Sequence, residues 1–263
     1  MHPLNSSDLH RTAAALVIGN ELLTGKTQDT NVPVLARELF ELGVSLRRVV
    51  MCPDEIETIV GDLDNLRRSY DFVVTSGGVG PTHDDVTMTA VARAFGQRLV
   101  RAPQIAALLR EFYGDRLTPH HLLMADVPEG ADLITISGSP WPTVRIENVF
   151  VLPGLPGVFR KKMAVLREVL GSDCPFVSRA VGTRSDEGDL AELLEQLSHE
   201  HPEVAIGSYP RWGDDPVQVL VTFDGRADEL VDHAVAALLA ALPPDQIVDR
   251  RGRLESVFRG QRS

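Results

Sequence analysis

Residues 71–85 read DFVVTSGGVGPTHDD, and this stretch decides the fold. The apolar run Asp71 to Thr75 is typical of a short strand buried in a sheet. The glycine-rich loop Ser76 to Asp85 follows, and residues 85–95 have the spacing of a helix that Gly96 ends. A strand, a glycine loop and a helix in this order form the repeating unit of a parallel α/β sheet.

The same alternation precedes this stretch. The continuous apolar run Ala13 to Ile18 indicates a central strand buried on both faces. Helical spacing over 32–42 is followed by an alternating strand over 44–51, and Asp54 with Glu57 resembles a capping box that starts another helix. The order βαβαβα predicts an α/β fold with a doubly wound, mostly parallel sheet and helices on both faces.

The remainder of the first domain is less regular. Residues 98–130 indicate a mostly helical excursion that could cover the site. Short strands are expected at 133–136 and 149–152, before a tight turn and a helix that runs through about Leu170. We therefore expect the first domain to span 13–172. The apolar face of the excursion is predicted to comprise Ile105, Leu108, Leu109 and Phe112.

A different pattern begins at residue 176. The order βαββα predicts a second, smaller α+β domain over 175–249. Residues 1–12 are predicted to form a disordered leader and residues 250–263 a basic tail. The βαββα order resembles that of KH-like RNA-binding modules, but the segment lacks a GXXG loop and has little basic charge, so a structural role is expected.

Charge and composition exclude several functions. The 263 residues carry a net charge of −11, which disfavours a sequence-independent nucleic-acid surface because such binding relies on Lys and Arg. The sequence has no run of about eighteen apolar residues, so we expect no membrane span. It also lacks a secretory signal pattern, and we therefore expect a cytoplasmic protein. Cys52 and Cys174 lie far apart without ligand-spaced partners, which favours buried thiols over a disulfide or a zinc site.

The glycine loop is the candidate binding site. Gly77, Gly78 and Gly80 can turn sharply and aim several backbone N–H groups at one anion, for which phosphate is the natural choice. The following helix is expected to begin at Asp84-Asp85, so that its free amides would also favour an anion. The alternative is a plain turn in which one of these aspartates caps the helix.

The carboxylates beside this loop suggest a metal. Asp84 and Asp85 would repel a phosphate unless a divalent cation bridges the two anions. Glu21 follows the first strand and could complete the metal site. Asp54 is expected to be a helix cap, and His83 a solvent-facing bystander.

Five segments of the first domain resemble the molybdopterin-binding domain superfamily. Its branch with competence/damage-inducible protein A, and with the molybdopterin-binding-like domain of eukaryotic FAD synthases, is the most similar. Residues 148–154 and 206–210 resemble the FAD-synthase-associated type. The five segments are Gly19 to Gly25, Thr30-Asn31, Leu42-Gly43, Ser76 to Asp85 and Leu152-Pro153-Gly154.

The resemblance implies a doubly wound sheet, a homo-oligomer and ligand contacts from the loop. It implies either metal-dependent hydrolysis of FAD, ADP-ribose or a related diphosphate, with Mg, Mn or Co, or else binding or adenylylation of molybdopterin without hydrolysis. Where competence-type proteins carry Gly-Thr-Ala-Pro-Gly, this chain has Ser139 to Thr143, so one substrate-contacting segment differs. From its place near the start of the first helix, Asn31 could equally be a helix cap. The implied ligand contacts are Asn31, Ser76, Gly77, Gly78, Gly80, Thr82 and Gly154.

Three hypotheses therefore remain. In the first, a metal held by Asp84, Asp85 and Glu21 polarises a diphosphate while the loop amides hold a neighbouring phosphate and water attacks. In the second, the same loop binds the phosphate of a pterin. In the third, the chain acts mainly through protein contacts. Trp141 and Trp212 could each stack on a ligand ring, or they could pack against their own domains.

Overall fold

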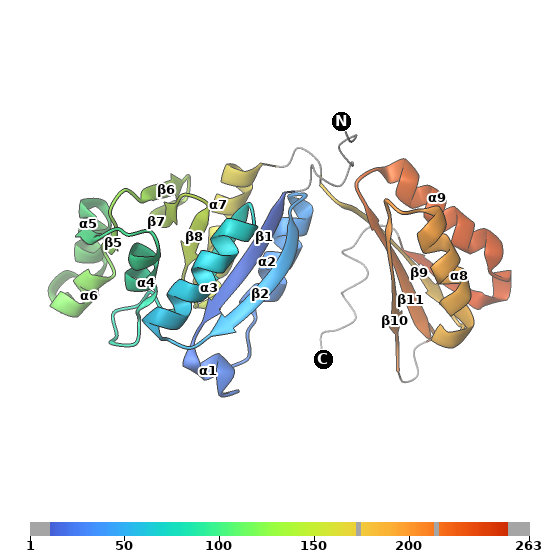
Figure 1. The fold of residues 1–263 in the computed structure, drawn as a ribbon, viewed down its shortest axis with the longest axis horizontal. Coiled ribbons are helices and arrows are strands. Elements are labelled where there is room, and N and C mark those ends of the chain that lie inside the picture. The colour runs from blue at the N-terminus through green and yellow to red at the C-terminus, as the bar shows by residue number, and fades with distance from the viewer. Residues whose placement is uncertain (1–10, 172–174, 213–215, 252–263) are drawn as a thin grey trace. The chain divides into compact units, whose positions relative to one another are not determined.

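The computed structural model describes residues 11–171, 175–212 and 216–251. The chain divides into two compact units, Met1–Asp173 and Cys174–Ser263 (Figure 1). Each unit has its own sheet and its own hydrophobic core.

The first unit is built on a six-stranded sheet of order β2-β1-β3-β8-β7-β6. The first four strands in this order run parallel, and β7 and β6 add an antiparallel hairpin at one edge. The predicted mostly parallel sheet is confirmed. The strands are β1 Thr12–Ile18, β2 Ser45–Cys52, β3 Phe72–Ser76, β6 Asp132–Ile136, β7 Ser139–Ile146 and β8 Val149–Leu152.

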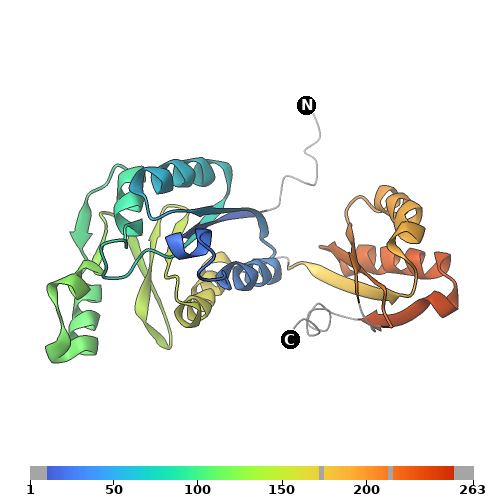
Figure 2. The ribbon, with the colours of Figure 1, turned by 90° about the horizontal axis from the view of Figure 1, so that it is seen from below.

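Helices cover both faces of this sheet, as the doubly wound prediction requires (Figure 2). Alternate residues of β1 point to opposite faces, so Leu16 packs in the core with α3 and α4, whereas Ala15 packs in the core with α2 and α7. The helices of this unit are α1 Asn20–Leu23, α2 Asn31–Glu41, α3 Ile56–Ser69, α4 Thr87–Ala94, α5 Pro103–Tyr113, α6 Pro119–Leu123 and α7 Pro156–Leu170.

The excursion between residues 98 and 130 is helical, but a short ribbon closes it. Strands β4, Leu99–Arg101, and β5, Asp126–Pro128, pair antiparallel and enclose α5, the 3₁₀ helix Gly114–Arg116 and α6. Two of the predicted apolar residues of α5, Ile105 and Leu109, are buried. Phe112 is instead exposed.

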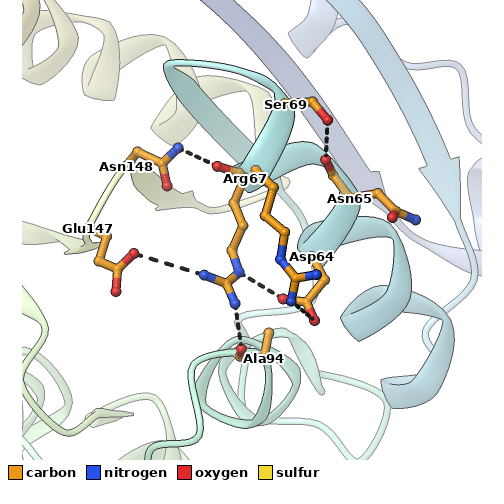
Figure 3. Close-up of polar contacts among 8 residues, drawn as sticks. Asp64, Asn65, Arg67, Ser69, Ala94, Glu147 and Asn148 are labelled. Atoms are coloured by element: carbon orange, nitrogen blue, oxygen red, sulfur yellow. Dashed lines mark hydrogen bonds and ion pairs between the residues drawn. The ribbon is translucent and has the colours of Figure 1, made fainter.

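Arg67 ties the elements on one face of the sheet together (Figure 3). Its guanidinium donates to Asp64 Oδ1 at 2.7 Å and to the carbonyl of Ala94 in α4 at 3.1 Å. The Asn148 amide, in the turn between β7 and β8, donates to the carbonyl of Arg67 at 2.9 Å. One turn of α3 is thereby fixed against α4 and against the β7–β8 hairpin.

The second unit is an α+β domain around the antiparallel sheet β10-β11-β9-β12. The last strand, β12, was not predicted, and it places Arg250 in the sheet, although a tail was predicted from residue 250 onward. Residues 207–210 lie in β10. The elements are β9 Val177–Thr183, α8 Glu187–Glu200, β10 Ala205–Pro210, β11 Val219–Gly225, α9 Asp228–Ala241, the 3₁₀ helix Pro244–Gln246 and β12 Ile247–Arg251.

The predicted leader is too long at its carboxyl end. Thr12 begins β1, and the Arg11 guanidinium donates to the carbonyls of Leu42, at 3.0 Å, and Leu170. The predicted disorder of residues 1–10, the rest of the predicted tail and the predicted burial of Cys174 lie outside the described residues. Cys52 is buried, as predicted, and burial raises the pKa of its thiol to about 12.

Candidate functional site

A pocket of about 730 Å³ opens at the carboxyl edge of the parallel strands in the first unit. Parallel sheets place the loops after their strands along this edge, which is where ligands of doubly wound proteins bind. The pocket has the size of a small-molecule site. The structure brings together at its walls nine of the ten predicted site residues: Glu21, Asn31, Ser76, Gly77, Gly78, Gly80, Asp84, Asp85 and Gly154.

Glycine is required at two positions of the loop. Gly77 has a φ of 109° and Gly78 a φ of 63°, and side-chain-bearing residues rarely adopt either value. A Cβ on Gly77 would stand 2.1 Å from the Ile18 carbonyl oxygen. A Cβ on Gly78 would stand 2.3 Å from Thr87 Oγ1. The loop therefore packs tightly against the end of β1 and the start of α4.

Thr87 locks this loop from the first residue of α4. Its backbone N–H donates to the Gly78 carbonyl at 3.0 Å, and its hydroxyl donates to the Gly77 carbonyl at 2.9 Å. Thr87 is fully buried, and its role was not predicted from the sequence. A threonine that follows two aspartates resembles an ordinary first-turn residue, so no signal in the sequence separates this role from a helix cap.

The predicted start of α4 is wrong by two residues. The helix begins at Thr87, with Val86 at the N-cap position, so neither Asp84 nor Asp85 starts it or caps it. Asp85 Oδ2 instead accepts hydrogen bonds from the Thr82 backbone N–H at 2.9 Å and from the Thr82 hydroxyl at 2.5 Å. Thr82, which does not line the pocket, therefore acts on the loop through Asp85.

Asn31 joins three segments at the base of the pocket. Its amide Nδ2 donates to Ser76 Oγ at 3.0 Å and to the Gly154 carbonyl at 2.7 Å. Its Oδ1 is buried and has no hydrogen-bond partner in the described structure. The N-cap position of α2 is taken by Thr30, and Asp29 accepts the Val32 N–H at 2.9 Å, so Asn31 is not the cap. A buried, unpaired acceptor at a pocket wall is suited to a ligand donor.

Asp54 adds another carboxylate to the pocket. It was expected to cap α3, but its Oδ2 accepts the Asn20 backbone N–H at 2.8 Å and thereby fixes the start of α1, which carries Glu21. Burial is the largest cause that raises the pKa of Asp54, and the negative charges of Glu21, Asp84 and Asp85 raise it further. The pocket therefore concentrates negative charge at one end.

The carboxylates fit a cation bound together with a phosphate, but they do not form a ready protein cage. Among the residues that the structure describes, no three or more His, Cys, Asp or Glu side chains converge as a metal site. Magnesium is commonly held by one or two carboxylates plus substrate phosphates, and the repulsion that raises the pKa of Asp54 would be relieved by a cation. It remains a prediction that Glu21, Asp84 and Asp85 bind the metal ion.

The other end of the pocket is apolar, with one basic group. Phe112 of α5 packs edge-to-face against Trp141 of β7, with ring centroids 5.9 Å apart. Lys162 of α7 is buried beside them, and it is the only basic side chain among the described residues that line the pocket. It lies between the buried residues Phe159 and Met163 of the helix, and this helical spacing is the signal by which its burial could have been predicted.

The remaining candidates, His83 and the two tryptophans, differ in where they lie. The His83 side chain is almost fully exposed, as expected of a bystander, with Nδ1 4.0 Å from Asp84 Oδ1. Trp212 is 92% exposed in the second unit, whereas Trp141 lines the pocket.

In the described parts of the chain, no helix is both long and apolar enough to cross a bilayer.

Fold and pocket together define an α/β protein with a small-molecule site at a glycine loop. Comparison with known families agrees. The profile of the family "Probable molybdopterin binding domain" matches residues 14–171, and that of "FAD synthase, middle domain" matches residues 175–251. The chain therefore belongs to the molybdopterin-binding domain family.

Individual relatives support both parts of this assignment. A protein from Archaeoglobus fulgidus is 30% identical over 83% of this chain and 92% of its own length. A probable FAD synthase of Caenorhabditis elegans is 32% identical over 87% of this chain, and the match spans 49% of that relative's length. The crystal structure of the protein CinA, of unknown function, from Thermoplasma acidophilum superposes with a TM-score of 0.57 at 29% identity, covering 61% of this chain and 98% of that chain.

Proposed function

We propose that this chain binds a phosphorylated nucleotide or pterin and, with a divalent cation, hydrolyses a diphosphate such as FAD or ADP-ribose. The observation that carries the proposal is one pocket with a constrained glycine loop, an aromatic wall and a group of four carboxylates, Asp54 and the three whose charges act on it. A ligand with a phosphate at one end and a planar ring at the other matches this division. The names of the matching families point to the same ligand classes.

The loop backbone would hold the phosphate. The Gly77 N–H already donates to the Leu152 carbonyl at 3.2 Å, so the phosphate would be met by the N–H groups of Gly78 to Gly80. Thr87 keeps these groups in place through its two hydrogen bonds to the loop carbonyls. Fixed N–H donors that need no reorganisation stabilise charge that develops on a phosphate oxygen.

The carboxylates would bind the cation. Bound by Asp84, Asp85 and Glu21, a Mg, Mn or Co ion would polarise the diphosphate and lower the pKa of an attacking water. Hydrogen bonding lowers the pKa of Asp84, which favours its ionised form. Asp54 would act as a positioning residue, because it fixes the start of α1 and hence Glu21.

The family match supports a second candidate, a molybdopterin-binding or molybdopterin-adenylylating protein without hydrolase activity. In that case the same loop would hold the pterin phosphate. A third possibility, a subunit that acts mainly through protein contacts, requires that ligands leave thermal stability unchanged. A homo-oligomeric state and a cytoplasmic location stay part of our proposal.

Release of mononucleotides is the decisive assay. The full chain is incubated with FAD or ADP-ribose and Mg²⁺, Mn²⁺ or Co²⁺, and AMP is quantified by chromatography. We expect metal-dependent AMP release that Asp84→Asn and Asp85→Asn each reduce at least about tenfold. Asp115→Asn, an exposed carboxylate outside the pocket, is the matched control and should leave the rate unchanged. Absence of AMP with every metal, together with tight molybdopterin binding, would favour the second candidate.

A further inference from the structure

Four side chains form one region of the pocket, here called the ring bay: Phe112, Trp141, Pro142 and Lys162. They come from α5, β7 and α7. The rings of Phe112 and Trp141 meet at an interplanar angle of 81° and offer an aromatic wall. Phe112 is 61% exposed, although it packs on Trp141, so part of this wall is open to a ligand.

Lys162 places a fixed ammonium group in the ring bay. Its Nζ donates to the Trp141 carbonyl at 2.6 Å and to the Pro142 carbonyl at 3.0 Å. An ammonium has three N–H donors, so one N–H of Lys162 remains available after these two hydrogen bonds. No ion pair among the described residues involves Lys162. Two backbone carbonyls therefore orient this group, and they do not neutralise its charge.

The ring bay lies at a useful distance from the glycine loop. Ser76 of β3 pairs with Leu152 of β8, and Val151 of β8 pairs with Val144 of β7. Strand β7 is antiparallel to β8, so Trp141 and Pro142 lie at the same sheet edge as the loop. Two strand spacings separate β3 from β7, which amounts to about 10 Å. A ribose-sized linker between phosphate and ring spans this separation.

We propose that Lys162 is a specificity-determining residue whose remaining N–H donates to a carbonyl on the ligand's ring, so that the pocket prefers rings with a carbonyl edge to adenine. Flavin, pterin and hypoxanthine rings carry such a carbonyl. Adenine presents an amino group at the corresponding position, and two donors that face each other repel. This inference rests on the proposed function, because it assumes that the glycine loop binds the phosphate.

Inosine diphosphate and adenosine diphosphate test this inference, because they differ only on one edge of the six-membered ring. Hypoxanthine has a C6 carbonyl beside an N1–H, whereas adenine has a C6 amino group beside an unprotonated N1. Their dissociation constants are measured by calorimetry with the full chain in buffer containing Mg²⁺. The wild type should bind inosine diphosphate about tenfold more tightly, the effect of one charge-assisted hydrogen bond. Lys162→Met should bring the two constants within about twofold of each other. Lys161→Met, on the exposed side of the same helix, should keep the preference.

Equal affinity of the wild type for the two nucleotides overturns the inference and leaves the proposed function standing. A preference that persists in Lys162→Met also overturns it, because the discrimination then arises elsewhere. If neither nucleotide binds, both the proposed function and the inference fail. The comparison within the wild type needs no variant, so a folding defect in Lys162→Met would not prevent the test.

Discussion

Replacing Lys162 by Met should change how the stability of the first unit depends on pH. Methionine has a similar length but no charge, and burial is the cause that lowers the pKa of Lys162 from 10.5 to about 8. The unfolded chain therefore holds this proton more firmly than the folded chain does. In such a case the free energy of unfolding rises with pH, here between about pH 8 and about pH 10.5.

The size of this effect follows from the two pKa values. Each pH unit between them corresponds to about 1.4 kcal/mol of unfolding free energy. From pH 7 to pH 9.5 the stability of the wild type should rise by about 2 kcal/mol relative to Lys162→Met, because the variant has no proton to lose at this position. The two lost hydrogen bonds of Lys162 add a difference that does not depend on pH over this range.

Urea unfolding at both pH values measures this difference. Trp141 lies in the first unit, so its fluorescence reports on that unit when the exposed Trp212 is replaced by Phe in every variant. Lys161→Met is the control, and its difference from the wild type should stay flat between pH 7 and pH 9.5. An equally flat difference for Lys162→Met would refute the assignment of a buried, charged lysine.

Three further substitutions test the loop and the packing around it. Gly77→Ala should cost about 3 kcal/mol or more in urea unfolding, because of its positive φ and the clash with the Ile18 carbonyl; Gly157→Ala, with open space around the new methyl group, should change stability by less than about 1 kcal/mol. Thr87→Val should lower the free energy of unfolding by about 1–3 kcal/mol, since the Gly77 carbonyl loses its buried donor, and calorimetry should show weaker ADP binding. Thr87→Ser keeps the hydroxyl and should retain most of the stability and most of the ADP affinity. Arg67→Met should lower the midpoint of thermal unfolding by several degrees, and an unchanged midpoint would show that its contacts to α4 contribute nothing.

The regular strands of the first unit could be predicted from the sequence because a buried strand has a continuous run of apolar residues. The run over 13–18 is apolar throughout, since both faces of β1 are covered. The strand β7 has no such run, because Pro140 and Pro142 interrupt its pattern near the edge of the sheet. The strand β12 is missed for a similar reason, since only Ile247 and Val248 of its five residues are apolar.

The candidate site could be predicted as a place but not as a set of contacts. The glycines at 77 and 78 are readable from sequence because the backbone conformation they adopt excludes other residues. The partner of an aspartate is not readable, since Asp85 could cap a helix or bond within its loop with equal local spacing. Asn31 illustrates the same limit, because Thr30 takes the N-cap position and Asp29 accepts the free N–H groups of Asn31 and Val32.

A crystal structure of the full chain with ADP-ribose and Mg²⁺ tests the central claim most directly. We predict that the diphosphate lies against the backbone N–H groups of Gly78 to Gly80, with Asp84 or Asp85 in contact with the cation. The Asn31 Oδ1 should gain a donor from the ligand or from an ordered water. A diphosphate bound elsewhere on the chain, with the glycine loop free of ligand, would contradict the account.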